Sequence, residues 1–193
     1  MTRDNRTIQE TNAAGDVTTW TYDGVGSLSS MTAPTTNVTT YTYDADDRRT
    51  KTVDGGGTVA TYTYDAVGNQ LTQTDGNGNM TTTTYDAIYR ITQVTDPLGN
   101  RTSYNYDAVG NLLLTTDRNG IVTSYAYDEI NRRTSRTDAL SNVTQYQYDR
   151  VGNVTKLTDA NGHSTNYTYH AVNRRLKETD TFSRTYTTTS WAT

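Results

Sequence analysis

The chain has 193 residues, a formal net charge of −4 and a pI near 5.1. Nucleic-acid binding needs a clustered basic face, so this charge argues against a nucleic-acid partner. The chain has no Cys, which excludes disulfides and thiol chemistry. It also lacks a run of about 18 apolar residues that could span a membrane, and its amino terminus shows no signal-peptide h-region.

The dipeptide Tyr-Asp recurs every 21 residues, with no residue inserted or lost. A fixed period of this kind is the signature of a repeat architecture, in which each unit buries surface only against its neighbours. The repeat positions are Tyr22, Asp23, Tyr43, Asp44, Tyr64, Asp65, Tyr85, Asp86, Tyr106, Asp107, Tyr127, Asp128, Tyr148, Asp149 and Tyr169, the last of which is followed by His170.

Each 21-residue unit predicts two strands and two turns. The first strand has the pattern Thr-x-aromatic-x-Tyr, whose period of two puts Thr102, Tyr104 and Tyr106 on one face and Ser103 and Asn105 on the other. Four turn-like residues follow, then a Thr/Val-rich second strand and a Gly-Asn type turn. We therefore expect an all-β fold with two strands per unit, about 18 strands in all for nine units at most.

The abundance of Tyr indicates a sheet that is wet on both faces. The chain has 16 Tyr against one Phe, and only 32% of its residues are hydrophobic. A Tyr ring can pack while its hydroxyl reaches water or a partner, whereas a dry sandwich core needs more Leu, Ile and Phe. We expect Tyr and Thr columns to hold the strip together by cross-strand packing.

A second period is twice as long as the first, because two kinds of unit alternate in pairs. In one kind, a Gly and a small polar residue close the turn, as at Gly26-Ser27, Gly68-Asn69, Gly110-Asn111 and Gly152-Asn153. In the other kind, Arg stands there instead, at Arg48-Arg49, Arg90, Arg132-Arg133 and Arg174-Arg175. The Arg side chains could line a surface for an anionic partner, but pairing with nearby acids such as Asp46, Asp47 and Glu129 is the plainer interpretation.

These motifs resemble the YD repeat (Rhs repeat) family, which includes bacterial Rhs proteins, the B and C components of insecticidal toxin complexes, and teneurins. The resemblance covers roughly residues 4 to 180. It implies a twisted, curved strip of antiparallel β-hairpins that spirals into a hollow shell, and in toxin members the shell encloses a cytotoxic domain. We expect residues 1–180 to form the repeat array and 181–193, including Phe182, Tyr186 and Trp191, to form a degenerate cap or truncated end.

The candidate chemical sites have simpler structural interpretations. Asp residues repeated about 10 Å apart are too distant to share a calcium ion, so each is expected to accept hydrogen bonds from its own turn. His163 and His170 are isolated, which makes a poor metal site, and no Gly-x-Ser-x-Gly nucleophile motif occurs. We therefore expect no catalytic residues, no metal and no cofactor.

Two further motifs fall in ordinary turn positions. Asp96-Pro97-Leu98-Gly99 is similar to the Asp-Pro segments of the family's autocleaving core, but it occupies the same slot as Asp117-Arg118-Asn119-Gly120. The Asn-x-Thr sequons that begin at Asn37, Asn142 and Asn153 arise because a turn Asn precedes a strand Thr.

Two functions are compatible with these features. The first is a non-catalytic segment of a shell that encapsulates a toxin or other cargo, in a secreted or cell-surface bacterial protein with a role in competition. Its partners would be neighbouring repeats of a longer parent chain and the enclosed cargo. The alternative is a surface binding module that holds carbohydrate or a partner protein on its Tyr and Trp columns. Unpaired strands at either end also predict self-association.

Overall fold

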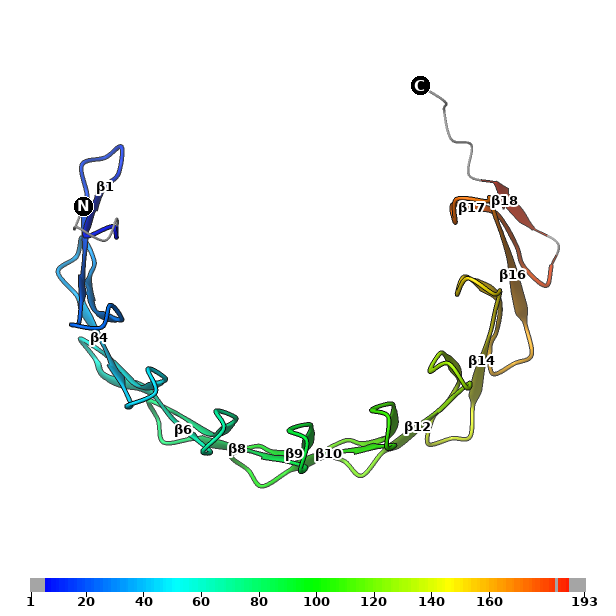
Figure 1. Cartoon of the computed structure of the whole chain (residues 1–193), viewed down its shortest axis with the longest axis horizontal. Helices are drawn as coiled ribbons and strands as arrows, with labels where there is room; N and C mark the ends of the chain where they lie inside the picture. The colour runs from blue at the N-terminus through cyan, green and yellow to red at the C-terminus, as the bar shows by residue number, and fades with distance from the viewer. Residues whose placement is uncertain (1–5, 183, 188–193) are drawn as a thin grey trace. The chain divides into compact units, whose positions relative to one another are not determined.

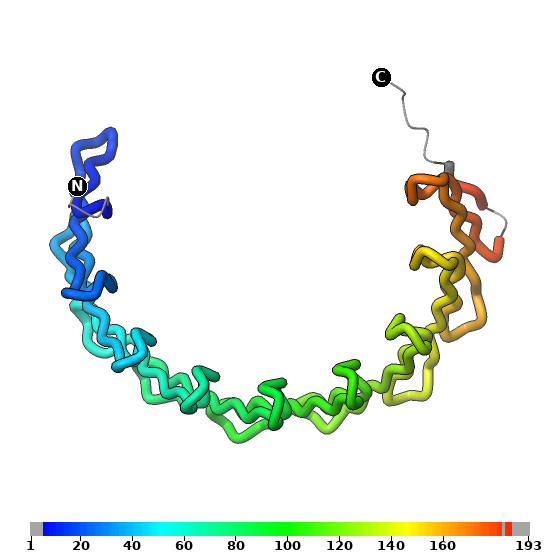
Figure 2. The backbone as a smooth tube through the Cα atoms, viewed as in Figure 1, coloured from blue at the N-terminus to red at the C-terminus, as the bar shows by residue number. Residues whose placement is uncertain are grey.

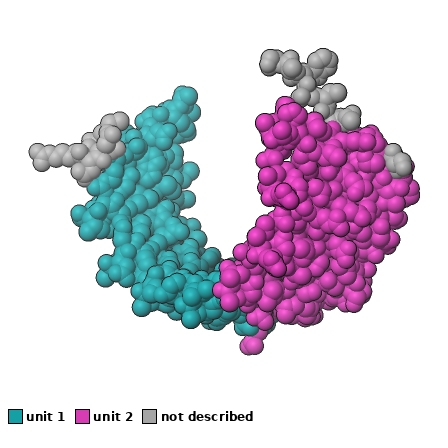
Figure 3. Space-filling model, turned by 45° about the vertical axis from the view of Figure 1, so that its right-hand side comes forward, with its two compact units in different colours: residues 1–100 teal, residues 101–193 magenta. Residues whose placement is uncertain are grey.

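A computed structural model of the chain describes residues 6–182 and 184–187. Two compact units lie within residues 1–100 and 101–193, called unit 1 and unit 2 (Figure 3). The described residues contain strands and turns and no helix, so the predicted all-β class is confirmed. Asn5, Ser183, Trp191 and the rest of 188–193 lie outside the described residues.

The described residues form 18 strands, the number that two strands per 21-residue repeat predict. Unit 1 contains β1 (Gln9–Thr11), β2 (Val17–Tyr22), β3 (Leu28–Thr32), β4 (Val38–Tyr43), β5 (Arg49–Asp54), β6 (Gly57–Tyr64), β7 (Gln70–Asp75), β8 (Met80–Tyr85) and β9 (Ile91–Thr95). Unit 2 contains β10 (Arg101–Tyr106), β11 (Leu112–Thr116), β12 (Val122–Tyr127), β13 (Arg133–Thr137), β14 (Val143–Tyr148), β15 (Val154–Thr158), β16 (Ser164–Tyr169), β17 (Arg175–Thr179) and β18 (Thr185–Thr187).

Within each unit, every strand pairs antiparallel with the strands before and after it along the chain. The result is a single layer of consecutive hairpins, which can be followed by colour in Figures 1 and 2. The turns that follow Tyr-Asp project from one side of each unit's sheet. The turns that lead from one hairpin to the next project from the other side (Figure 1). At the end of the array, β18 pairs with β17 after the turn at Asp180, while the division of the chain at residue 180 stays a prediction.

The register places all strand aromatics on one face of each unit. In unit 2, Tyr104 lies opposite Thr115, which lies opposite Thr123, and Thr123 shares its face with Tyr125 two residues later. The other face carries exposed side chains at the position between the two aromatics, such as Asn105. The predicted alternation along the first strand of each hairpin therefore holds.

A β-bulge, which the sequence pattern did not predict, interrupts every hairpin before its turn. In β10 and β11, Asn105 lies opposite Leu114 while Tyr106 lies opposite Leu112, so Leu113 is an extra residue on β11. The same shift occurs in the other hairpins, for example at Ser29 between Leu28 and Ser30. A bulge bends its strand and increases the local twist.

Except at β5–β6, pairing between successive hairpins covers fewer residues than pairing within them, and a tyrosine hydroxyl completes it. The β3–β4 ladder contains three residue pairs and ends at Ser30 and Thr40. Beyond that point, the Tyr43 hydroxyl donates to the Leu28 carbonyl oxygen at 2.9 Å. The same bond to the carbonyl fifteen residues earlier, at 2.7–3.0 Å, is made by Tyr22, Tyr64, Tyr85, Tyr127, Tyr148 and Tyr169.

The sheet has almost no dry interior. Among the described residues, Ala60 at 7% exposure is the one buried apolar side chain, and most strand residues are half-buried. Hydrophobic burial against a second layer therefore contributes little. Cohesion between hairpins depends on backbone ladders and on side chains that bridge them.

We expect Tyr127→Phe to lower the free energy of unfolding by about 1 kcal/mol, the usual net value of one hydrogen bond. The change keeps the ring but removes the donor to the Leu112 carbonyl oxygen, 3.0 Å away. Thermal or urea unfolding followed by circular dichroism measures the effect. Tyr89→Phe, in a turn residue that is 57% exposed, is the control and should leave stability unchanged. Equal stability of both variants and the parent would contradict a bridging role.

Candidate functional site

Tight turns that begin at the repeat Asp or at His170 form one row in each unit, four turns in unit 1 and four in unit 2, and each is called a Tyr-Asp row. They cover residues 23–27, 44–48, 65–69, 86–90, 107–111, 128–132, 149–153 and 170–174. In a typical member, the Gly68 N–H donates to the Asp65 carbonyl at 3.2 Å, and the Asp65 N–H donates to the Asn69 carbonyl at 2.9 Å. The fourth residue has positive φ, either as a Gly such as Gly68 (101°) or as Asp47 (62°).

The repeat Asp closes this turn with its side chain. Asp65 Oδ1 accepts the N–H groups of Val67 (3.0 Å) and Asn69 (2.8 Å), and Oδ2 accepts the Asn69 amide at 2.7 Å. In the Arg-type turns the guanidinium replaces that amide, with Arg48 Nε donating to Asp44 Oδ2 at 2.8 Å. The carboxylates are thus acceptors for their own turns, as expected, and not a ladder of open ligands.

The two kinds of 21-residue repeat, which alternate along the chain, make two different contacts between successive turns. An Arg-type turn reaches the next turn through its guanidinium, because Arg132 Nη1 donates to the Asp149 carbonyl oxygen at 2.6 Å. A Gly-Asn turn reaches the next Arg-type turn through its amide, because Asn111 Nδ2 donates to Asn131 Oδ1 at 2.8 Å. Equivalent contacts join Arg48 to Asp65 (2.8 Å), Asn153 to Asn173 (3.1 Å) and the Ser27 hydroxyl to the Asp47 carboxylate.

The Arg side chains are held by this row and by the aromatic face. Arg132 pairs with Asp128 at 2.7 Å, one residue before the expected Glu129, and stacks 4.8 Å from the Tyr148 ring centroid. Arg133 lies over both Tyr125 and Tyr146. The expected pairing with a neighbouring acid occurs at Arg48, whose Nη2 lies 3.2 Å from Asp46. Guanidinium groups engaged in this way do not form an open surface for an anionic partner.

The opposite turns form a second row in each unit, called the return row, with the same backbone hydrogen bonds except at 54–57, where Asp54 lies opposite Gly57 in a tighter turn. It covers residues 12–16, 33–37, 54–57, 75–79, 96–100, 117–121, 138–142 and 159–163, and the turn that begins at Asp180. Asp96 Oδ1 accepts the Leu98 and Asn100 N–H groups at 2.9 Å, so Asp96-Pro97-Leu98-Gly99 is an ordinary return turn. The sequon Asn142 and Asn153 amides bond to Asp138 and Asp149 in their turns, at 3.0 and 2.8 Å.

The two His residues lie in separate turns. His163 Nδ1 is 3.3 Å from Asp159 Oδ2, and its ring lies 5.5 Å from that of Phe182. His170 takes the place of the repeat Asp, and its Nδ1 accepts the Val172 N–H at 3.4 Å. Within the described residues, no group of three or more His, Cys, Asp or Glu side chains is arranged to hold a metal ion.

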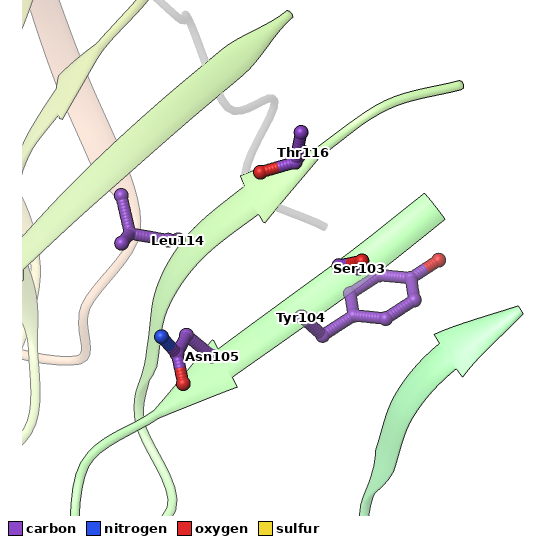
Figure 4. A pocket seen from close by; sticks show the side chains of 5 residues that line it. All are labelled: Ser103, Tyr104, Asn105, Leu114 and Thr116. Carbon is purple, nitrogen blue, oxygen red and sulfur yellow. The ribbon is translucent and has the colours of Figure 1, made fainter. Parts of the chain in front are cut away.

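The strand surfaces are shallowly hollowed. A depression of about 190 Å³ in unit 2 is lined by Ser103, Tyr104, Asn105, Leu114 and Thr116 (Figure 4). It contains hydroxyl and amide groups but no titratable pair for acid–base chemistry. Among the described residues there is also no helix long and apolar enough to cross a membrane.

Hydrogen bonding in the turns lowers the pKa of the repeat Asp carboxyls below the ordinary 3.8. For Asp44, Asp86 and Asp128, the backbone N–H of the Arg four residues later is the largest cause, and the guanidinium of the same residue adds to it. For Asp65 and Asp149, the side-chain amide of Asn69 or Asn153 comes first. Partial burial opposes the shift in each turn.

We expect the unfolding temperature to fall as the pH drops through 3.8 and below. A carboxyl with a lowered pKa in the folded state contributes stability that is present above the unfolded value and is lost when it is protonated. Circular dichroism melts between pH 6 and 2 would measure this. Asp65→Asn is the matched variant, because Asn12 already accepts two turn N–H groups without titrating. It should show a shallower acid dependence, and identical profiles would contradict the assignment.

His170→Asp should raise the unfolding temperature by roughly 2–4 °C, the response to about 1 kcal/mol in a chain of this size. The new carboxylate would accept the Val172 and Arg174 N–H groups and pair with the Arg174 guanidinium, as Asp128 does with Arg132. Asp128→His, the reverse change, should lower it. A neutral or negative effect of His170→Asp would show that turn closure by Asp does not limit stability there.

Comparisons with known proteins identify the repeat. The family model described as "Teneurin YD-shell" matches residues 17–173. A crystal structure of TcdB2-TccC3 without its hypervariable C-terminal region has a TM-score of 0.69 at 21% identity, covering 83% of this chain and 10% of that one. The structure of a Photorhabdus luminescens Tc holotoxin pore has a TM-score of 0.63 at 17% identity, with 84% and 12% covered. The TcdB2-TccC3-Cdc42 structure has a TM-score of 0.63 at 18% identity, with the same coverage.

No curated protein sequence shows a significant match. The present chain spans only about a tenth of the length of the solved chains it resembles, and at these identities the likeness concerns the fold. The matched span, residues 17–173, contains β2 to β16 and, within each unit, the Tyr and Asp contacts between successive hairpins. From this match and the tyrosine–carbonyl bonds that recur from one repeat to the next, we conclude that the chain belongs to the teneurin YD-shell family.

Proposed function

We propose that this chain is a non-catalytic structural segment of a shell wall that encapsulates a toxin or other cargo, in a secreted or cell-surface bacterial protein. The observation that supports it most is the way each hairpin is fastened to the one before it. A backbone ladder and a tyrosine hydroxyl recur between hairpins, and a side-chain bond joins several pairs of successive turns, as at Ser135–Gln145, Tyr148 and Arg132. Such a sheet extends by adding units and needs no core of its own.

The polarity of the sheet agrees with a wall that has water or cargo on either side. Its strand residues are half-buried or exposed, and the described residues include no buried polar or charged side chain. The turn carboxylates and guanidinium groups are used by the turns themselves, which leaves no arranged acid, base and nucleophile among the described residues. Neighbouring repeats of a longer parent chain and an enclosed cargo are the partners that this role requires.

The alternative is a surface module that binds carbohydrate or a partner protein. It is favoured by the placement of every strand aromatic on one face of each unit. The Arg-type units oppose it, because Arg49 lies over the rings of Tyr41 and Tyr62 and occupies the surface on which a sugar would stack. Cargo enclosure is compatible with aromatics on one face and with Arg side chains over their rings, because it needs a continuous wall and no exposed ring for a sugar to stack on.

Small-angle X-ray scattering with in-line light-scattering mass would test the proposal. A compact monomer of this length should have a radius of gyration of about 16 Å. We expect a clearly larger radius, or multimers joined end to end, because a single-layer strip cannot bury its own faces. A monomer with the compact radius would mean that the sheet closes on itself, and the binding module would then be the better assignment. A glycan array with the same sample should show no binding.

A further inference from the structure

Three pairs of adjacent Arg residues stand at the same place in the Arg-type repeats, where a turn ends and the next strand begins. They are Arg48-Arg49 in unit 1, and Arg132-Arg133 and Arg174-Arg175 in unit 2. The residue after each pair is the extra residue of a β-bulge, as Thr134 is in β13 and Leu176 in β17. The peptide bond that follows each pair therefore lies where the ladder is interrupted.

In unit 2, the turns that precede the two pairs are closed differently. Asp128 accepts two turn N–H groups and the Arg132 Nε, at 2.7–3.1 Å. His170 takes the place of this Asp, and its Nδ1 accepts only the Val172 N–H, at 3.4 Å. Within the described part of the chain, the exposed Arg174 side chain makes no hydrogen bond or ion pair. The turn at His170 is therefore held by fewer bonds than the turn at Asp128.

A repeat tyrosine occupies the carbonyl oxygen of the second Arg in two of the three pairs. The Tyr64 hydroxyl donates to the Arg49 carbonyl at 2.8 Å, and the Tyr148 hydroxyl donates to the Arg133 carbonyl at 2.7 Å. Fifteen residues after Arg175, the sequence has Ser190 in place of Tyr. The repeat tyrosine that must release this carbonyl before the strand can leave the sheet is thus missing at the third pair.

The side chain of the second Arg is also held less firmly at the third pair. The Arg133 guanidinium lies over two tyrosine rings, 4.8 and 5.8 Å from their centroids. The Arg175 guanidinium lies 5.6 Å from the Tyr167 ring and 3.3 Å from the Glu178 carboxylate, and its side chain is 53% exposed. An exposed ion pair of this kind contributes little, so the Arg175 side chain can turn toward a partner.

We propose that Arg174-Arg175 is a processing site for an endoprotease that recognises paired Arg, with cleavage between Arg175 and Leu176. Carboxylates in the enzyme's subsites would pair with the two exposed guanidinium groups. Water adds across the peptide bond, which leaves a carboxylate on Arg175 and an amino group on Leu176. The cut separates residues 176–193 from the rest of the chain. This inference goes beyond the wall function and does not require an enclosed cargo.

The selectivity among the pairs comes from local opening of the sheet. A protease binds its substrate as a strand free of other partners, so the cleavage rate follows the population of locally opened chain. Opening at Arg133 has to break the bonds of Asp128 and Tyr148, whereas opening at Arg175 breaks neither kind. Arg150 is an exposed turn residue but has no basic neighbour, so an enzyme that requires a pair does not read it.

The test digests the whole native chain with an endoprotease specific for paired basic residues and follows the products by mass spectrometry. Each rate is divided by the rate for a synthetic peptide that spans the same pair, which removes the enzyme's preference for neighbouring residues. We expect the first cut after Arg175. Its normalised rate should be at least roughly tenfold that after Arg133, the effect of about two hydrogen bonds that need not break.

Two variants exchange the turn residues. His170→Asp gives the third pair a turn carboxylate and should slow cleavage after Arg175 about fivefold, the effect of one restored hydrogen bond. Asp128→His should speed cleavage after Arg133. Arg150→Gln is the control and should change neither rate. Circular dichroism melts would show that the variants fold.

A further variant separates recognition of the pair from simple exposure. Arg174→Gln removes one guanidinium and should abolish cleavage by the enzyme that requires a pair. Trypsin, which requires a single basic residue, should still cut this variant after Arg175.

Three results would overturn the inference. Equal normalised rates at all three pairs would mean that the structure does not distinguish them. A native chain that stays intact while the peptides are cut would show that β17 does not open, and an unchanged rate in His170→Asp would exclude the turn as the cause. None of these results bears on the radius of gyration that tests the wall proposal, so the two can fail separately.

Discussion

The hydrogen bond from the repeat tyrosine to the carbonyl fifteen residues earlier is the interaction on which this architecture depends. A single-layer sheet has no second layer against which hairpins can pack, and the ladder between hairpins ends after three residue pairs. The hydroxyl of Tyr43 or Tyr127 continues the connection where the backbones separate. Tyr suits this position because its ring covers the sheet face while its polar end still finds an acceptor. A Phe ring would cover the sheet face but would have no hydroxyl to donate to the carbonyl.

The turns add a second set of connections that explains why two kinds of unit alternate. A guanidinium at Arg132 reaches forward to a backbone carbonyl, and an amide at Asn111 reaches forward to the side chain of Asn131. The amide donor needs a side-chain acceptor in the next turn, as Asn131 supplies to Asn111, whereas the guanidinium uses a main-chain carbonyl that every turn has. The alternation is therefore a property of pairs of turns. It also places carboxylates and guanidinium groups where they satisfy each other, as Asp128 and Arg132 do.

Within each unit, a sheet built in this way is held together along the chain direction by hydrogen bonds, and its two rows of turns lie at the exposed edges. The side chains that fasten it are polar and are used internally, whereas Val151 and Leu140 at the rows are apolar and exposed. Contacts between hairpins therefore depend on hydrogen bonds that recur along the chain, and not on apolar packing.

The sequence by itself determined the all-β class, the two strands per repeat, the shared face of Tyr104 and Tyr106 and the turn role of Asp65. Each of these is a local consequence of spacing and turn chemistry. Only the tertiary structure decided the bulge at Leu113, the reach of Tyr127 to Leu112 and the pairing of Arg132 with the next turn. These depend on how one hairpin is offset from its neighbour, and the repeat period is compatible with several offsets.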